Sequence, residues 1–540
     1  MSIADFRRAA AVALVAAVCA IASPVPAQPA RNPWTIPGTL RVAVTIAPRS
    51  LNPILTTTAV EFDLARFCFD GLLATTPAGV PSPNLATEVP SLRNGGISRD
   101  GKAIRYRLRH GVRWHDGAPF TSRDVAFTWR AIMNPATNLQ NRLGYDQVAR
   151  VDTPDPYTVL FHMKRPFSPA LDSLMGYAVV IPAHILEKYP DLNNADFNGA
   201  PVGTGPFKFV RWVRGDRIEY VAYDGYHLGK PRLQRVIVRI IPADTTAAEQ
   251  VRAHEVDWYM RAQTISFRDL RGVPGVRRLA LKQNAQRQIV INTEHPPLDD
   301  ARVRRALTLA IDRRRLVDRL AFGTADPACG DLPPFSWAFD PAVTCPPFEP
   351  GAAARALREL GFEPGPDGVF VREGKRLSLS LVFSAGQPEA EGVAVQVQDM
   401  LKQAGVETEI HGYDPSMLFA LAANGGILEG GRFDLDVSSF IERPDPDDSR
   451  LLTCDNRAPR GFNASRYCSP EMDAAQRESL AAFDPVKRKR AISKIEHLVV
   501  REAPAIYLWW PRELHVINSD LQGIEDPPGL ASQLPYKWSI

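Results

Sequence analysis

The sequence carries almost no excess of charge of either sign. Its 540 residues include 64 lysines and arginines against 60 aspartates and glutamates, a formal net charge of +4. Such a balance gives no reason to expect nucleic acid or an anionic membrane as a partner. The apolar share of 45% and the charged share of 23% are ordinary for a soluble globular protein. Because 540 residues exceed what one hydrophobic core organises, we expect at least two domains.

The sequence also lacks a long apolar run outside its first residues. Arg7 and Arg8 precede the run AAAVALVAAVCAIAS, and Ala27 ends a VPA triplet. A short basic region, a short apolar region and a small residue describe a secretory signal peptide, which predicts cleavage after Ala27. No later run approaches the roughly 18 apolar residues of a membrane span. We therefore expect a soluble exported protein.

Motifs that carry catalysis or hold cofactors are missing. There is no G-x-S-x-G elbow, no H-E-x-x-H, no C-x-x-C and no Walker loop. GTGPF (203–207) lacks the third glycine and the following helix of a phosphate-binding loop, and the acids at 445–448 lack the spacing of a Ca²⁺ loop. We therefore expect no enzyme activity, no cofactor and no resident metal.

Cysteines are few, and there are only six in the chain. Export makes disulfides possible, and two local pairs are predicted, Cys329 with Cys345 and Cys454 with Cys468. Each bond would stabilise the fold by about 3 kcal/mol in the loop-entropy model. The alternative, that all these thiols are reduced, stays open. Cys68, in the apolar stretch RFCFDGLL, is predicted to be a buried free thiol.

The segment GVRWHDGAPFTSRDV (111–125) gathers polar side chains that resemble an active site. Asp116 and Gly117 form a turn dipeptide, and Thr121 with Asp124 is close to a helix capping box. Each polar residue therefore has a structural role available, and no third catalytic group is present. We interpret the segment as a strand end, a turn and a helix start.

Elsewhere, strands and helices alternate along the chain. Period-two patterns predict strands, and period-3.6 patterns with capping residues predict helices. The strands are expected at 40–46, 103–114, 156–163, 216–224 and 231–243, and the helices at 122–133, 301–312, 352–361, 391–405 and from Pro485 to about Val500. This alternation is typical of α/β layers.

The stretch DGKAIRYRLRHGVRWHDGAPFTSRDVAFTW resembles the signature of the family 5 extracellular solute-binding proteins, the peptide- and nickel-type receptors of ATP-binding-cassette importers. The similarity continues in order through SLNP (50–53), FDGLL (69–73), IPAHIL (181–186), the stretch PVGTGPFKFVRWVRGDRIEY, RPDPDD and EAPAIYLWW. Each motif alone is weak, but their number and order carry the resemblance along nearly the whole chain.

The resemblance implies an α/β fold, the two-lobed periplasmic binding protein fold (type II, cluster C-like) with an extra α+β subdomain inserted in the first lobe. The expected boundaries are a signal peptide at 1–27, lobe I at 36–68, 173–283 and 507–540, the insertion at 69–172, and lobe II at 284–506.

The same resemblance implies a ligand site between the lobes. Two segments match those that line the cleft in family members, Thr57-Thr58-Ala59 and VSSFIERPDPDD (437–448). Glu442 stands where peptide receptors carry an aspartate that pairs with the ligand ammonium, and Asp445 follows it. Ser439, with Phe440 beside it, stands where they carry a tryptophan.

Two further segments complete the expected site. FSAGQPEAEG, with Ser384 and Gln387, matches a stretch where dipeptide receptors hold the ligand carboxylate with an arginine, which is missing here. Trp509 is expected either to stack on ligand or to pack at the hinge.

These features predict a monomeric receptor that delivers a peptide or a related cationic small solute to the transmembrane subunits of an ATP-binding-cassette permease. An alternative within the family is a receptor for nickel or a metal chelate. A secreted hydrolase is a less favoured alternative from another class.

Overall fold

The computed structural model describes residues 31–76, 80–139, 142, 144–174, 179–441, 445–524 and 534–540. The chain separates into two compact units, Met1–Thr35 and Ile36–Ile540. In the first unit, the described residues contain a turn in which the Thr35 N–H donates to the Asn32 carbonyl at 3.1 Å. The expected signal peptide, with its cleavage after Ala27, lies outside the described residues.

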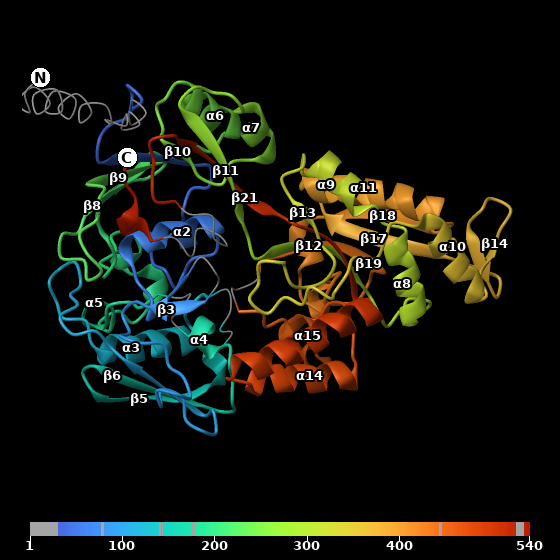
Figure 1. Ribbon diagram of the computed structural model, residues 1–540, viewed down its shortest axis with the longest axis horizontal. Helices are drawn as coiled ribbons and strands as arrows, with labels where there is room; N and C mark the ends of the chain where they lie inside the picture. The colour runs from blue at the N-terminus through green and yellow to red at the C-terminus, as the bar shows by residue number, and fades with distance from the viewer. Residues whose placement is uncertain are drawn as a thin grey trace, which may run out of the picture. The chain divides into compact units, whose positions relative to one another are not determined.

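The second unit contains two large sheets, and the first has seven strands (Figure 1). Their order is β11 (Val276–Lys282), β21 (Arg512–Asn518), β10 (Trp258–Tyr259), β1 (Thr39–Val44), β9 (Arg235–Ile240), β8 (Arg217–Ala222) and β7 (Phe207–Val213). Helices cover both faces, because alternate side chains of β1 enter two different cores. These helices are α2 (Ala59–Cys68) on one face, and α6 (Asp244–Arg252) and α7 (Thr264–Asp269) on the other, with the short helix α5 (Ala183–Leu186) joining the first core.

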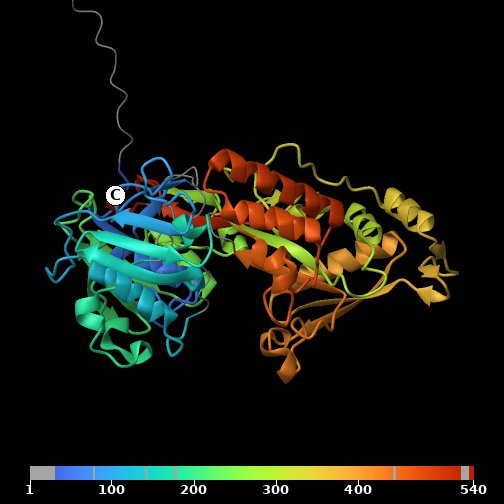
Figure 2. The same cartoon turned by 90° about the horizontal axis from the view of Figure 1, so that it is seen from below.

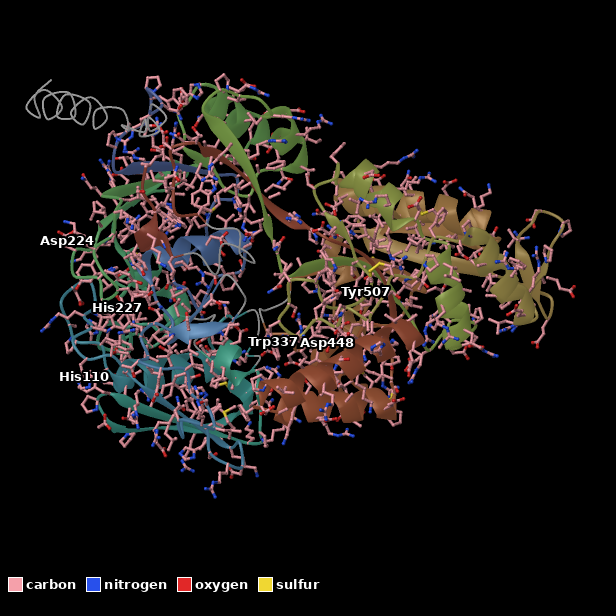
Figure 3. The ribbon with its side chains drawn as sticks, viewed as in Figure 1. His110, Asp224, His227, Trp337, Asp448 and Tyr507 are labelled. Carbon is pink, nitrogen blue, oxygen red and sulfur yellow. A yellow bond between two sulfur atoms is a disulfide. The ribbon has the colours of Figure 1, made fainter. Side chains whose placement is uncertain are left out.

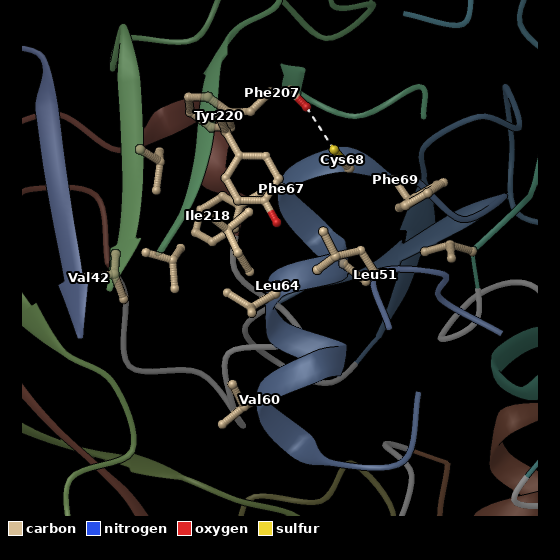
Figure 4. Close-up of a cluster of buried hydrophobic side chains, with 14 of the residues drawn as sticks. Val42, Leu51, Val60, Leu64, Phe67, Cys68, Phe69, Phe207, Ile218 and Tyr220 are labelled. Carbon is tan, nitrogen blue, oxygen red and sulfur yellow. Dashed lines mark hydrogen bonds between the residues drawn. The ribbon is translucent and has the colours of Figure 1, made fainter. Parts of the chain in front are cut away.

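The core around α2 shows why GTGPF is rich in glycine (Figure 4). A Cβ atom on Gly203 would lie 1.7 Å from the carbonyl oxygen of Cys68, and one on Gly205 would lie 2.5 Å from its carbonyl carbon. The motif therefore allows close packing on the end of α2. Cys68 is free and buried as predicted, and its thiol donates to the Phe207 carbonyl at 3.3 Å.

A smaller α+β part with its own core interrupts the first sheet. It contains the pair β2 (Leu73–Thr75) and β3 (Pro81–Pro83), the sheet β4 (Ala103–Arg107), β6 (Thr158–Met163) and β5 (Val148–Asp155), and the helices α3 (Ser122–Met133) and α4 (Ala170–Ser173). The capping box between Thr121 and Asp124 is present at the start of α3. The strand predicted over 103–114 ends earlier, at Arg107, because the chain turns through Gly111 with φ of +75°.

The second sheet has six strands. Their order is β13 (Asp326–Pro327), β20 (Ala505–Trp510), β12 (Ala285–Ile291), β19 (Leu435–Ile441), β17 (Ser378–Ser384) and β18 (Glu407–Tyr413). The expected return to lobe I at residue 507 falls inside β20, so the chain leaves the second sheet only after Trp510.

Helices cover both faces of the second sheet as well. One face carries α8 (Ala301–Leu309), α9 (Arg313–Leu320), α10 (Pro350–Glu359) and α11 (Pro388–Gln403). The other packs against α14 (Pro470–Ala481) and α15 (Pro485–Glu502), which lie side by side (Figures 1 and 2). Short elements complete this part: α12 (Pro415–Leu418), α13 (Ser449–Leu452), and the strands β14 (Glu363–Pro364), β15 (Phe370–Arg372) and β16 (Lys375–Arg376).

Two details of these helices differ from the sequence prediction. The helix expected over 301–312 ends at Leu309, and Asp312 caps a separate helix by accepting from the Arg315 N–H at 2.9 Å. The arginines of this segment do not all face solvent. Arg304 and Arg313 are buried and donate to the main-chain carbonyls of Glu502 and Tyr507.

Candidate ligand-binding site

The middle of the second sheet presents one polar face. The register sets Gln286 opposite Phe440 and Gln288 opposite Ser438 on β19, and it sets Gln288 opposite Tyr507 on β20. Residues paired in this way point to the same side of a sheet, and so do residues two apart on one strand. Tyr507 belongs to the core shared with α14 and α15, so this face is the one beneath those helices.

Two adjoining hollows open on this face, and we call them together the Gln–Asp pocket. The first spans about 400 Å³ with the open solvent at its mouth included, and its lining includes Gln288, Phe440, Phe462 and Tyr507. The second, of about 410 Å³, is lined by the acids at 445, 447 and 448 and by Trp510. Both hollows are lined by Gln286, Asp331 and Asp448. Figure 3 labels Asp448 and, from the first hollow, Tyr507.

Several acceptor atoms in this pocket have no hydrogen-bond donor. They are Oε1 of Gln286, Oε1 of Gln288 and Oδ2 of Asp448, none of which meets a donor from the described part of the chain. The three residues are only 2%, 4% and 7% exposed. A buried acceptor left without a donor costs about 1–3 kcal/mol, so these oxygens favour an incoming donor.

Two carboxyl groups of the pocket, those of Asp448 and Asp447, have raised pKa values. Asp448 accepts from Gln476 Nε2 at 2.6 Å, and burial, then the neighbouring Asp331, raises its pKa well above the usual value. Burial likewise raises the pKa of Asp447.

Asp445, which the sequence placed among the ligand contacts, is already occupied. Its two oxygens accept from Arg488 Nη1 and Nη2 at 2.6 Å each, and the two side chains are 10% and 8% exposed. This ion pair supports the pocket wall, and the direct ligand contact expected of Asp445 stays a prediction.

Trp509 also differs from one of its two expected roles. It is 1% exposed and lies in the apolar core with Ile289 and Leu508. A ring enclosed in this way is not available to stack on ligand, so packing near the crossover is the role that remains.

The other predicted residues of this lobe gather at one end of the sheet. Ser384 ends β17, Gln387 directly precedes α11, and Ser439 is exposed near the end of β19. Ser439 pairs with Arg287, which the sequence analysis missed and which bonds Glu389 of α11 at 2.6 Å.

Residues 439 and 440 point to opposite faces of the sheet. Phe440 therefore lines the Gln–Asp pocket while Ser439 lies on the α11 side. A ligand that contacts both side chains would therefore have to lie along the edge of β19.

The remaining predicted contacts stand apart from this group. Thr57, Thr58 and Ala59 lie at the amino end of α2, where the Thr58 side chain accepts from the Glu61 N–H at 3.3 Å. Thr57 is exposed, while Thr58 and Ala59 are half-buried. Glu442 lies outside the described residues.

Both disulfides border the pocket. Cys454 is bonded to Cys468 and Cys329 to Cys345, the two pairs expected from the sequence. The first loop carries Phe462, and the second begins two residues before Asp331. The cross-links therefore restrain two walls that are far apart in sequence.

The arrangement can be compared with known proteins. A family model described as bacterial extracellular solute-binding proteins, family 5 (middle), matches residues 80–460. The chain belongs to this family. The resemblance noted in the sequence is thereby confirmed, and family 5 is a family of extracellular binding proteins rather than of enzymes.

Two curated relatives and one solved structure are similar to this family 5 protein. The glutathione-binding protein GsiB of Salmonella paratyphi A is 29% identical over 79% of this chain and 81% of its own. The oligopeptide-binding protein AppA of Bacillus subtilis is 25% identical over 89% and 88%.

The solved structure is NikZ of Campylobacter jejuni in complex with Ni(L-His). It aligns with a TM-score of 0.75 at 24% identity, over 94% of this chain and 100% of its own. This agreement confirms the predicted two-lobed fold.

The helices and the titratable side chains of the family 5 protein add two further observations. Among its described residues, no helix is both long and apolar enough to cross a membrane. The same residues contain no group of three or more histidine, cysteine, aspartate or glutamate side chains that could hold a metal ion.

Proposed function

We propose that this family 5 protein is the receptor of an ATP-binding-cassette importer that captures a peptide or a related cationic solute in the periplasm. It presents this ligand to the permease without covalent chemistry. The names of two relatives support a peptide ligand, since one is described as oligopeptide-binding and the other as binding glutathione, itself a tripeptide.

The observation that carries the proposal is the strand β19, whose second half pairs with a neighbouring strand on one side only. All of β19 pairs with β12, but within the described residues only Leu435 and Asp436 pair with β17. The end of β19, Val437–Ile441, therefore has an unpaired edge. An extended peptide can add main-chain hydrogen bonds to such an edge whatever its side chains are.

The connections between the sheets support capture by closure. The chain crosses between them twice, through Gln283-Asn284 from β11 to β12 and through Pro511 from β20 to β21. Two short crossings form a hinge, and a ligand that contacts both lobes stabilises the closed state. We assign lobe I to the first sheet and lobe II to the second.

The proposed ligand contacts come from both lobes. Those from lobe II are Ser384, Gln387, Ser439, Phe440 and Glu442, and those from lobe I are Thr57, Thr58 and Ala59.

Isothermal titration of the purified protein against peptides of two to five residues tests the proposal. We expect at least one length to bind, and a ligand at 100 times its dissociation constant should stabilise the protein by about 2.7 kcal/mol. Absence of heat and of any thermal shift with every peptide would contradict the peptide ligand. Metal analysis of protein purified without chelator tests the alternative, since bound nickel would favour a metal receptor.

A further inference from the structure

The Gln–Asp pocket has a lining that selects for the charge of its occupant. Its deep side holds the unpaired oxygens of Gln286, Gln288 and Asp448, which are acceptors. Arg488, which supports this wall, donates two hydrogen bonds to Asp445. The pocket therefore offers acceptor oxygens and carboxyl groups to whatever enters it.

The rest of the lining is apolar and leads outward. Leu451, Leu452 and Phe440 line the same hollow, and so does Phe462, which is 55% exposed. Gln288 and Tyr507 are only 4% and 6% exposed, so the exposed Phe462 marks the open side and the glutamine the deep side. Such a path suits a side chain with an apolar stem and a charged tip.

We propose that the Gln–Asp pocket is a subsite for a basic ligand side chain, with an ammonium group such as that of lysine at its deep side. An ammonium group has three donors, and three buried acceptor atoms await donors here. The proposal rests on the proposed function, because it names the side-chain class that a peptide receptor of this kind prefers.

The acids of the pocket couple ligand binding to the release of a proton. With the pocket empty, burial and then the neighbouring Asp331 hold the pKa of Asp448 well above its usual value, so this carboxyl group keeps a proton. When the ammonium enters, its positive charge replaces that of the proton, which passes to solvent. No bond of the ligand is made or broken.

Matched tripeptides test the subsite. Lys-Ala-Ala, Ala-Lys-Ala and Ala-Ala-Lys are titrated at pH 7 beside the same peptides with norleucine in place of lysine, in two buffers of different ionisation enthalpy. We expect at least one lysine peptide to bind at least 10-fold more tightly than its norleucine counterpart. That peptide alone should release up to one proton per molecule bound.

The failures of the two proposals are distinguishable. Equal affinities without proton release at all three positions would overturn the subsite and leave a peptide receptor standing. If no tripeptide binds, the titration of peptides of two to five residues decides the peptide ligand, and millimolar n-butylammonium probes the pocket by itself against 1-butanol. A thermal shift with the amine alone supports the subsite, and equal or absent shifts overturn it.

Variants locate the effect in the pocket. Gln288→Leu removes one acceptor with little change in volume and should weaken the lysine peptide about 10-fold, while the norleucine peptide changes less than twofold. Gln398→Leu is the matched control, because Gln398 lies on α11, bonds the Thr408 carbonyl at 2.7 Å and does not line the pocket. Equal weakening of both peptides by Gln288→Leu would overturn the assignment, and Asp448→Asn repeats the test if that variant is unstable.

Discussion

Replacing Asp445 with alanine should destabilise lobe II strongly, because the substitution leaves a buried guanidinium without its main partner. The carboxylate bonds Arg488 twice at 2.6 Å, and the two side chains are 10% and 8% exposed. Breaking a buried pair by removing one partner costs about 3–5 kcal/mol, since the other charge stays out of water.

The lower part of that range applies here. Asp447 lies near enough to raise the pKa of Arg488 along with Asp445, so a second carboxylate compensates in part. We therefore expect a loss of about 3 kcal/mol. The double variant Asp445→Leu with Arg488→Met should recover much of it, because no unpaired charge of that pair remains buried.

The measurement is urea unfolding at pH 7, with Asp326→Ala as the matched control. Asp326 also pairs with an arginine, Arg512, at 2.7 Å, but its side chain is 55% exposed, and such pairs contribute about 0–1 kcal/mol. An Asp445→Ala protein as stable as the Asp326→Ala protein would refute the reasoning. Unchanged stability with lost peptide affinity would instead support the prediction that Asp445 contacts the ligand directly.

Three further predictions follow from buried or cross-linked groups. Burial raises the pKa of Asp436 to about 7, so its contribution to stability is complete below about pH 4 and is lost as the pH rises through 7. Asp436→Asn should therefore remove a fall of about 3 kcal/mol in unfolding free energy between pH 5 and pH 8, measured by denaturant titration. Gly203→Ala should lower the thermal midpoint far more than Gly351→Ala. The Cβ at position 203 would lie 1.7 Å from a main-chain oxygen, whereas the Cβ at position 351 would lie 3.6 Å from its nearest neighbour, Arg355 Nη1. Replacing Cys454 and Cys468 with serine should cost about 3 kcal/mol by denaturant unfolding, and an unchanged midpoint would contradict this.

Features fixed by neighbouring residues were predictable from the sequence. Asp484 accepts from the Lys487 N–H at 2.9 Å, and Pro485 opens α15, as their types and order indicated. Gly361 and Gly405 follow α10 and α11 with φ of +83° and +81°, the left-handed conformation expected after a helix end. In each case the cause and the effect lie within a few residues of each other.

Features that depend on distant partners were not predictable in this way. Arg313 occurs in an arginine-rich stretch that reads as a solvated helix face, yet it bonds the Tyr507 carbonyl 194 residues away. The pairing of Asp445 with Arg488, 43 residues apart, was equally hidden. Only the folded chain shows which charges are buried, and therefore which acids are occupied.

The Gln–Asp pocket did leave one signal in the sequence, in the strand AQRQIVI of β12. A central strand covered on both faces is normally apolar throughout, so Gln286 and Gln288, two residues apart, place two amides on one buried face. Their acceptor oxygens lack donors within the described chain, whereas buried polar atoms are usually satisfied. The family motifs named in the sequence analysis do not include AQRQIVI, so the resemblance assigns no role to these two glutamines. The most economical account of them is therefore that the ligand supplies the donors.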